Sequence, residues 1–285
     1  MATDTSTTGH ITVADGVRLR YWQDGPVSGP NIVFIAGWAQ TAASFKKQVS
    51  YFKTAFRVTT YDNRGHGESD KPSFGYRVPR LAADLDAVLT QLDLRSVTLV
   101  GHSMGAAVTW AHWDLFARDR VAKLVFIDQA RSLMAFPAWT EREKALAGSV
   151  FSPEQVFEFV AALRGPQWKE TRAAMARRFY TDDFAPEDFE WALQESLKTP
   201  PEIAAEMMAS MAMMDWGDVF PRINVPTLVF HAKANLMPIE AGEWIAKQVP
   251  NARCVSFEKE EKGSHFMFFE NPEKFNRVLE EFLNE

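Results

Sequence analysis

The stretch Leu99-Val100-Gly101-His102-Ser103-Met104-Gly105 decides how this chain of 285 residues folds. It has the form Gly-x-Ser-x-Gly, follows the apolar segment 97–100 and precedes a helix-compatible segment, 106–116. Between a strand and a helix, this pattern is typical of a sharp turn that holds the serine above the sheet. Only glycine fits on both sides of such a turn, where backbones crowd together. The stretch therefore predicts a nucleophilic Ser103 at a helix N-terminus, whose dipole favours negative charge.

Strand-like and helix-like segments alternate on both sides of this turn. Residues 11–22 alternate apolar and polar around Asp15-Gly16, which predicts an antiparallel hairpin. Apolar runs predict strands at 31–36, 56–61, 97–100, 123–127, 226–231 and 253–257, and helices are expected at 45–52, 81–92 and 272–283. Strands that alternate with helices pair in parallel through right-handed crossovers, so we expect an α/β fold with a mostly parallel central sheet.

The pattern changes between residues 131 and 216, where we find helix-like segments but no buried strand. We therefore expect an α/β core, 1–130 and 217–285, interrupted by a helical cap, 131–216. This segment is rich in aromatic residues and methionine, which would give an apolar substrate pocket. The candidate pocket residues are Phe136, Trp139, Met211 and Met214, with Gln40 and Phe266 from the core. The alternative is that these side chains simply pack the cap onto the core.

Composition excludes several classes of protein. The formal net charge is −6 and no dense basic run is present, which argues against a nucleic-acid binder. No segment has the roughly 18 uninterrupted apolar residues of a membrane span, and residues 1–10 lack the apolar core of a secretion signal, so we expect a cytoplasmic protein. The single cysteine, Cys254, lies in an apolar run and is expected to be a buried structural thiol. Since the sequence shows neither a metal-ligand cluster nor a dinucleotide fingerprint, we expect no metal and no cofactor. The expected partner is a small apolar substrate, bound by a monomer or homodimer.

A serine hydroxyl becomes a good nucleophile when a neighbouring base takes its proton. His265 is the strongest candidate, because it lies in a loop after the last predicted strand, and loops at the carboxyl ends of parallel strands converge above the sheet. The alternative is a solvated loop histidine. His102 adjoins Ser103, but consecutive residues in a tight turn point apart, so we expect it to pack beneath the turn. His66 lies in a glycine-rich loop and is expected to be structural.

The base needs an acid on its other nitrogen, and the sequence offers two positions for it. Asp128 ends the strand 123–127, whereas Asn235 follows the strand 226–231. An amide accepts a hydrogen bond but supplies no negative charge to stabilise an imidazolium, so Asp128 is the expected acid. The alternative role for Asp128 is to cap the next segment through backbone N–H groups.

Two backbone N–H groups are expected to bind the oxyanion that develops during acyl transfer. One belongs to Met104, at the start of the predicted helix. The other is expected from the loop after strand 31–36, where Trp38 follows Gly37.

Together these residues resemble the α/β-hydrolase superfamily over essentially the whole chain. The matching segments are 36–38, 61–69, 101–105, 226–229 and 263–266. In most members of this family the acid follows the penultimate strand, where this chain has Asn235. A minority place it one strand earlier, as Asp128 would be: the haloalkane dehalogenases, whose nucleophile is an aspartate, and the cofactor-free 2,4-dioxygenases that cleave quinolone rings. Those dioxygenases carry histidines where this chain has Gln40 and Met104.

Three functions follow from these expectations. The leading hypothesis is a serine hydrolase that cleaves an ester or lactone of a hydrophobic or aromatic small molecule through an acyl-enzyme. The second is cofactor-independent oxygenation of a heteroaromatic, quinolone-like substrate, in which His265 and Asp128 deprotonate the substrate. The third is a non-enzymatic ligand-binding protein that keeps the fold.

Overall fold

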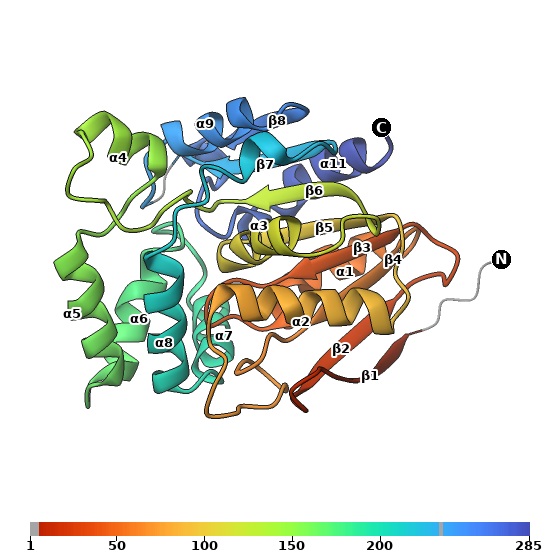
Figure 1. Cartoon of the computed structure of the whole chain (residues 1–285), viewed down its shortest axis with the longest axis horizontal. Coiled ribbons are helices and arrows are strands. Elements are labelled where there is room, and N and C mark those ends of the chain that lie inside the picture. Colours follow the sequence, from red (N-terminus) through yellow and green to blue (C-terminus); the bar gives the residue numbers. More distant parts are fainter. Residues whose placement is uncertain (1–5, 234–235) are drawn as a thin grey trace.

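The structure is a computed structural model, and it describes residues 6–233 and 236–285. Its centre is an eight-stranded sheet in the order β1-β2-β4-β3-β5-β6-β7-β8 (Figure 1). The strands are β1 (Thr7–Thr12), β2 (Arg18–Asp24), β3 (Asn31–Ile35), β4 (Arg57–Tyr61), β5 (Val97–His102), β6 (Val121–Ile127), β7 (Thr227–Ala232) and β8 (Ala252–Phe257). β2 pairs antiparallel with β1 and with β4, and the other pairs are parallel. The predicted mostly parallel α/β sheet is confirmed.

Helices cover both faces of this sheet. Residues that alternate along one strand enter different cores, as the period of two in a strand requires. Val33 of β3 packs in the core that contains α2 (Val78–Gln91), α3 (Met104–Leu115) and α9 (Glu240–Gln248), whereas Phe34 packs in the core with α1 and α11. The helices on the face of the sheet where Phe34 packs are α1 (Lys46–Phe52), α10 (Met267–Glu270) and α11 (Pro272–Leu283). The bounds of α11 match the helix predicted at 272–283.

Five further helices lie between β6 and β7 in the described chain, at one end of the sheet (Figure 1). They are α4 (Glu141–Ala147), α5 (Pro153–Arg164), α6 (Trp168–Arg177), α7 (Pro186–Leu197) and α8 (Pro201–Ala212). No strand occurs among the described residues of this region, and an isolated bridge joins Met134 to Phe151. These helices are the element type that the sequence predicts here. The division of the chain into a core and a cap remains a prediction.

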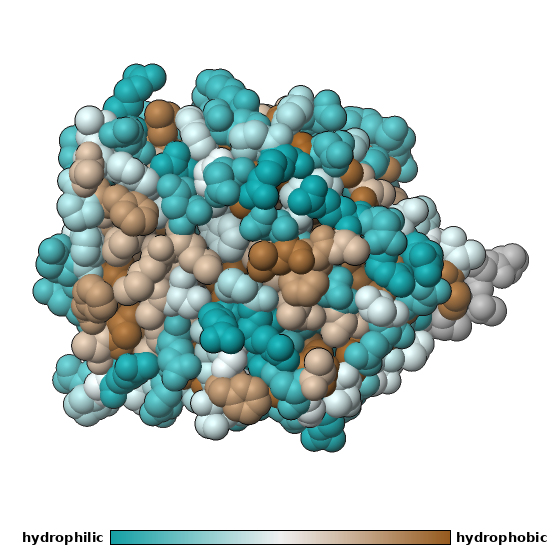
Figure 2. All heavy atoms as spheres, viewed as in Figure 1, coloured by the Kyte–Doolittle hydropathy of each residue, from teal (hydrophilic) through white to brown (hydrophobic). Residues whose placement is uncertain are grey.

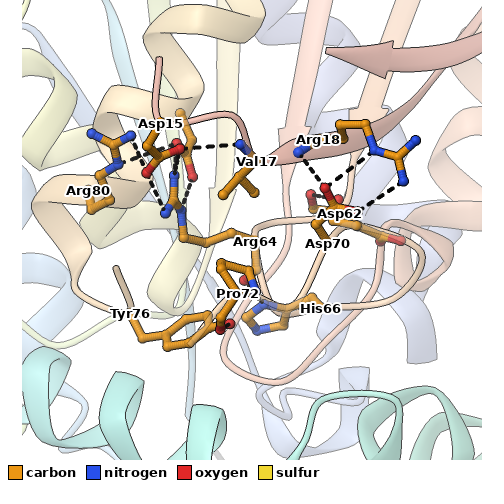
Figure 3. Close-up of polar contacts among 12 residues, drawn as sticks. Asp15, Val17, Arg18, Asp62, Arg64, His66, Asp70, Pro72, Tyr76 and Arg80 are labelled. Atoms are coloured by element: carbon orange, nitrogen blue, oxygen red, sulfur yellow. Dashed lines mark hydrogen bonds and ion pairs between the residues drawn. The ribbon is translucent and has the colours of Figure 1, made fainter. Parts of the chain in front are cut away.

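A buried arginine connects three parts of the chain. Arg64, which has a fully buried side chain, lies 2.5 Å from Asp84 of α2 and 3.0 Å from Asp15 of the β1–β2 turn. Arg80 of α2 pairs with the same Asp15 at 2.5 Å (Figure 3). Because a buried cation must be paired, this network holds the segment that follows β4 against the hairpin and α2.

The face drawn in Figure 2 mixes hydrophilic and hydrophobic residues, and hydrophobic residues gather over the end where α5 and α8 lie. Phe157 of α5 and Met213, which follows α8, are among the large hydrophobic residues that are exposed. None of the described helices has both the length and the apolar character that a membrane crossing requires.

Candidate active site

Ser103 occupies a strained turn between β5 and α3. Its backbone has φ 52° and ψ −123°, a conformation that is costly for any residue other than glycine. The flanking glycines are required by space. A Cβ at Gly101 would lie 2.5 Å from the carbonyl oxygen of Gly105, and a Cβ at Gly105 would lie 2.1 Å from that of Ile35. The predicted geometry of the turn is therefore present, with Ser103 at its apex.

The structure brings His265 and Asp128 together. Nδ1 of His265 lies 2.6 Å from Oδ2 of Asp128, although the two residues are 137 positions apart in the sequence. Both side chains are buried. Asp128 directly follows β6, where its backbone N–H donates to the carbonyl oxygen of Phe230 on the neighbouring strand β7. Pairing of β6 with β7 therefore places this carboxylate below the loop that carries His265.

Asp128 has a second imidazole on its other oxygen. Nδ1 of His231, in β7, lies 3.2 Å from Oδ1 of Asp128, and the backbone N–H of Ala232 donates to the same oxygen at 3.1 Å. Burial alone would raise the pKa of Asp128, but the hydrogen bonds from His231 and His265 outweigh it and lower the pKa well below its usual range. The carboxylate is therefore ionised at neutral pH. The competing position, Asn235, lies outside the described residues.

The loop of His265 is anchored from two sides. The ring of His102 donates from Nε2 to the carbonyl oxygen of His265 at 2.9 Å, and the N–H of His265 donates to the carbonyl oxygen of Phe179 at 3.1 Å. Burial lowers the pKa of His102 well below its usual value, and His265 lowers it further, so His102 is neutral. The ring of His102 packs against Phe266 and Phe268, and the residue also lines the cavity of Ser103.

Ser103 and His265 line the same cavity. Among the described residues, no direct hydrogen bond joins the hydroxyl of Ser103 to the ring of His265. Hydrogen bonds between such groups are often long without substrate and tighten when it binds.

The loop after β3 is held against the turn by His66. Nδ1 of His66 donates to the carbonyl oxygen of Arg64 at 3.0 Å, so Nε2 is free to accept from the N–H of Ala39, also at 3.0 Å. Ala39 has a positive φ of 52°, which needs such support. Burial lowers the pKa of His66 to about 4, so the ring stays neutral and keeps this acceptor. Figure 3 shows His66 beside Arg64 and Asp62.

Two backbone donors next to Ser103 are available for a ligand. Met104 is the first residue of α3, and the first N–H groups of a helix have no partner within it. The N–H of Trp38 donates to no other described residue. A Cβ on the preceding Gly37 would lie 3.1 Å from the Cβ of Ser103, which shows how closely this loop approaches the turn.

The cavity above Ser103 is apolar, with about 590 Å³ of empty space, part of it open to solvent. The region between β6 and β7 contributes a set of hydrophobic lining residues: Leu133, Val150, Phe151, Met175, Phe179, Met208 and Met211. No Asp, Glu, Lys or Arg lines it within the described part of the chain. Two amides, Gln40 and Gln129, supply the polar lining besides Ser103 and the two histidines. The Oε1 atom of Gln129 is buried and has no hydrogen-bond partner there.

The predicted pocket residues divide into two groups. Gln40, Met211 and Phe266 line the cavity. Phe136, Trp139 and Met214 do not. Phe136 and Trp139 pack on each other with ring centroids 4.8 Å apart, and Trp139 stacks on the guanidinium of Arg131. Met214 follows α8 and packs against the core from a half-buried position.

Two other expectations concern Cys254 and metal binding. Cys254 is half-buried rather than buried as expected, because its strand β8 is at the edge of the sheet. Burial still raises the pKa of its thiol to about 11, so it is protonated at neutral pH. Within residues 6–233 and 236–285, no group of three or more potential ligands is arranged to hold a metal ion.

Comparison with known proteins places this fold and turn in a family. The model of the alpha/beta hydrolase fold matches residues 30–272. The chain belongs to the α/β-hydrolase family. It is 30% identical to a non-heme chloroperoxidase from Streptomyces lividans, over 96% of this chain and 99% of that protein. It is 24% identical to 3-oxoadipate enol-lactonase 2 from Acinetobacter baylyi, over 94% and 93% of the two chains. An esterase from Exiguobacterium antarcticum has the same fold, with a TM-score of 0.88, 23% identity, and coverage of 98% of this chain and all of that one.

Proposed function

We propose that this α/β hydrolase cleaves an ester or lactone of an uncharged, hydrophobic small molecule. The observation that carries the proposal is the 2.6 Å contact between His265 and Asp128 at the wall of the apolar cavity that Ser103 lines. An ionised carboxylate that accepts from Nδ1 leaves Nε2 as the basic nitrogen on the cavity side. Relatives of this chain that are named as esterases or enol-lactonases support the same reaction class.

In the proposed reaction, Ser103 Oγ attacks the carbonyl carbon while His265 Nε2 takes its proton. Asp128 holds the imidazole in the required tautomer and stabilises the imidazolium. The N–H groups of Trp38 and Met104 bind the oxyanion. The tetrahedral intermediate collapses, and His265 returns its proton to the departing alkoxide oxygen. Water, activated by His265, then attacks the acyl-enzyme and releases the acid and the free serine.

The substrate class follows from the cavity wall. Because no charged Asp, Glu, Lys or Arg side chain lines the described cavity, a charged acyl group would lose its hydration without compensation there. We propose that residues 131–216 act as a cap, since helices α6 and α8 contribute Met175, Met208 and Met211 to this wall. Flexible methionine side chains adapt to ligands of different shape, which suits an aromatic or branched acyl group.

A panel of p-nitrophenyl esters and lactones with apolar acyl groups tests this function, with charged acyl esters as the comparison. We expect turnover of the neutral substrates, stoichiometric labelling of Ser103 by a phosphonate, and a loss on the order of 10⁶ in kcat for Ser103→Ala. Absence of both turnover and labelling would overturn the proposal.

A second candidate is cofactor-free oxygenation of a heteroaromatic, quinolone-like substrate. The observations that favour it are the position of Asp128 after β6 and the ring of His265, which makes no hydrogen bond to Ser103 and can reach a substrate directly. In this reaction the imidazole deprotonates the substrate, and the resulting anion reacts with dioxygen. Oxygen consumption during substrate loss, largely retained in Ser103→Ala, would favour this candidate over hydrolysis.

A further inference from the structure

Trp38 is fixed by helices from the region between β6 and β7, although it belongs to the loop after β3. Its indole N–H donates to the carbonyl oxygen of Ala204 in α8 at 2.8 Å. Its ring lies 6.0 Å from the ring of Phe159 in α5, between centroids. The guanidinium carbon of Arg172 in α6 lies 5.0 Å from its ring centroid. Three helices of the proposed cap therefore hold one side chain of the proposed oxyanion loop.

Arg172 is unusual among these contacts because it is a buried cation without an acidic partner. The residue is 1% exposed, and no Asp or Glu of the described chain forms an ion pair with it. Nη2 donates to the carbonyl oxygen of Ser196 at 2.5 Å and to its hydroxyl at 2.8 Å. Nε and Nη1 are buried and have no hydrogen-bond partner within the described residues. Burial lowers the pKa of Arg172 to about 10, so the group remains charged at neutral pH.

The stabilisation of this cation comes from two sources. Ser196 lies in the last turn of α7, where the negative end of the helix dipole favours a positive charge. The π face of Trp38 supplies the other, because cation–π attraction reaches about 2 kcal/mol or more when both groups are shielded from water. The charge of Arg172 is therefore best stabilised when the Trp38 ring stays in its present position. In the same way, the Trp38 ring is held most firmly when the Arg172 guanidinium stays in place.

We propose that Arg172 is a positioning residue that fixes Trp38 and, through it, the Trp38 backbone N–H that binds the oxyanion. This inference rests on the proposed hydrolase function. The N–H of Ala39, the next residue, is held by His66 at 3.0 Å, so the loop is fixed from the core on one side and from α6 on the other. Any displacement of α6 moves the indole and disturbs the donor at Trp38. A catalytically competent oxyanion site thus requires the helices between β6 and β7 to be seated.

The test is steady-state kinetics of Arg172→Met on a neutral aryl ester that wild type hydrolyses. The matched control is Arg178→Met, at the end of the same helix, where the side chain is exposed and lies outside the cavity of Ser103. We expect kcat to fall about tenfold in Arg172→Met with KM within twofold, because the lost interaction acts on the transition state. Inhibition by an aryl boronic acid, which forms a tetrahedral adduct with serine, is expected to weaken by the same factor. The control is expected to match wild type.

A double-mutant cycle with Trp38→Leu separates this role from general packing. Trp38→Leu keeps the backbone N–H but removes the π face, so adding Arg172→Met to it is expected to lower kcat less than twofold further. Additive losses, an unchanged kcat in Arg172→Met, or an increase in KM alone would each overturn the proposal. If Arg172→Met does not fold, the cycle is made with Arg172→Gln, which keeps hydrogen-bonding groups for Ser196 but removes the charge that attracts the π face of Trp38, and the same criteria decide. Absence of wild-type turnover and of Ser103 labelling would instead reject the proposed function, so the two failures are distinguishable.

Discussion

His231 lies 3.2 Å from one oxygen of Asp128, while His265 lies 2.6 Å from the other. The first histidine belongs to strand β7, next to the edge strand β8, and the second lies in the loop after β8. Because Nε2 of His231 is buried and has no partner among the described residues, this ring has no path to a substrate. Under the proposed function, His231 therefore acts by orienting the carboxylate of Asp128, which in turn orients His265.

Substitution of His231 by phenylalanine is expected to lower kcat about tenfold. The ring volume is retained, but the donor to Oδ1 is lost, while the N–H of Ala232 still donates to that oxygen. The pKa of Asp128 should rise, since its hydrogen bond from His231 helps to lower it. The value of kcat for ester hydrolysis, measured between pH 5 and 9, checks the expected tenfold loss. A His231→Phe variant with wild-type kcat would show that His231 does not contribute to catalysis.

Asp128→Asn is expected to lower kcat by a factor on the order of 10⁴. The reason is that an amide favours the wrong tautomer of His265 and does not stabilise its imidazolium form. Asn235→Ala is the control, with a change below threefold. The carboxylate of Asp128 has a folded pKa below its unfolded value, so its stabilisation is present above the unfolded pKa of about 3.9 and lost as pH falls through the folded value. Loss of activity between pH 5 and 7 therefore cannot come from Asp128. Large and equal losses in the two variants would mean that the acid is misassigned.

His66 makes the stability of the protein depend on pH. Its pKa is about 4 in the folded protein and about 6.5 when unfolded, so the unfolded chain binds more protons between these values. The free energy of unfolding should therefore fall as pH falls through this window, and by about 2 kcal/mol between pH 7 and 5 from this group alone.

The measurement for His66 is urea unfolding at pH 7 and pH 5, with His66→Gln as the comparison. The glutamine oxygen can accept from Ala39 N–H but does not titrate, so the variant should lose less stability on acidification. His102, whose pKa is also lowered, is present in both proteins and cancels. An identical loss in the two proteins would contradict this prediction.

Gln129→Leu is expected to raise the free energy of unfolding and to weaken the preference for acyl groups that form hydrogen bonds. The variant removes a buried, unpartnered Oε1, which should raise the free energy of unfolding by about 1 kcal/mol. It also removes a polar group from the cavity wall, so kcat/KM should fall for an acyl group that carries a hydrogen-bonding substituent more than for its methyl analogue. Paired esters measured on wild type and variant provide the comparison. The same ratio in both proteins would show that Gln129 contacts no substrate.

The fold could be predicted from the sequence because the patterns that indicate its strands and its turn lie in adjacent residues. Glycines around Ser103 and the apolar runs of the strands are required by crowding and burial, and both can be read from adjacent residues. Asp128 could be placed because it ends a strand, and the ends of parallel strands meet at one edge of the sheet.

The residues that the sequence did not predict depend on contacts between distant elements. His231 is one of six consecutive buried residues of β7, and its contact with Asp128 follows from the pairing of Ile127 with Phe230. Arg172 occurs in a charged helical segment that gave no sign of burial, and its surroundings come from Trp38 and Ser196. The aromatic residues Phe136 and Trp139 were expected in the pocket from composition, which does not specify the side of a segment that faces the substrate.

Substitution of Gly105 tests whether the close contact between α3 and β3 determines the stability of the protein and the position of Ser103. A Cβ at this position would lie 2.1 Å from the carbonyl oxygen of Ile35, which is fixed within the central strand β3. Since neither backbone can move aside easily, Gly105→Ala should destabilise the protein by about 3 kcal/mol and shift the N–H of Met104 away from the reaction centre. Gly165→Ala is the control, because Gly165 has φ −76° and its added Cβ would come no closer than 3.4 Å to a neighbouring atom. Urea unfolding and ester hydrolysis of both variants give the answer: equal stability and activity in the two alanine variants would show that the contact between α3 and β3 does not determine the position of Ser103.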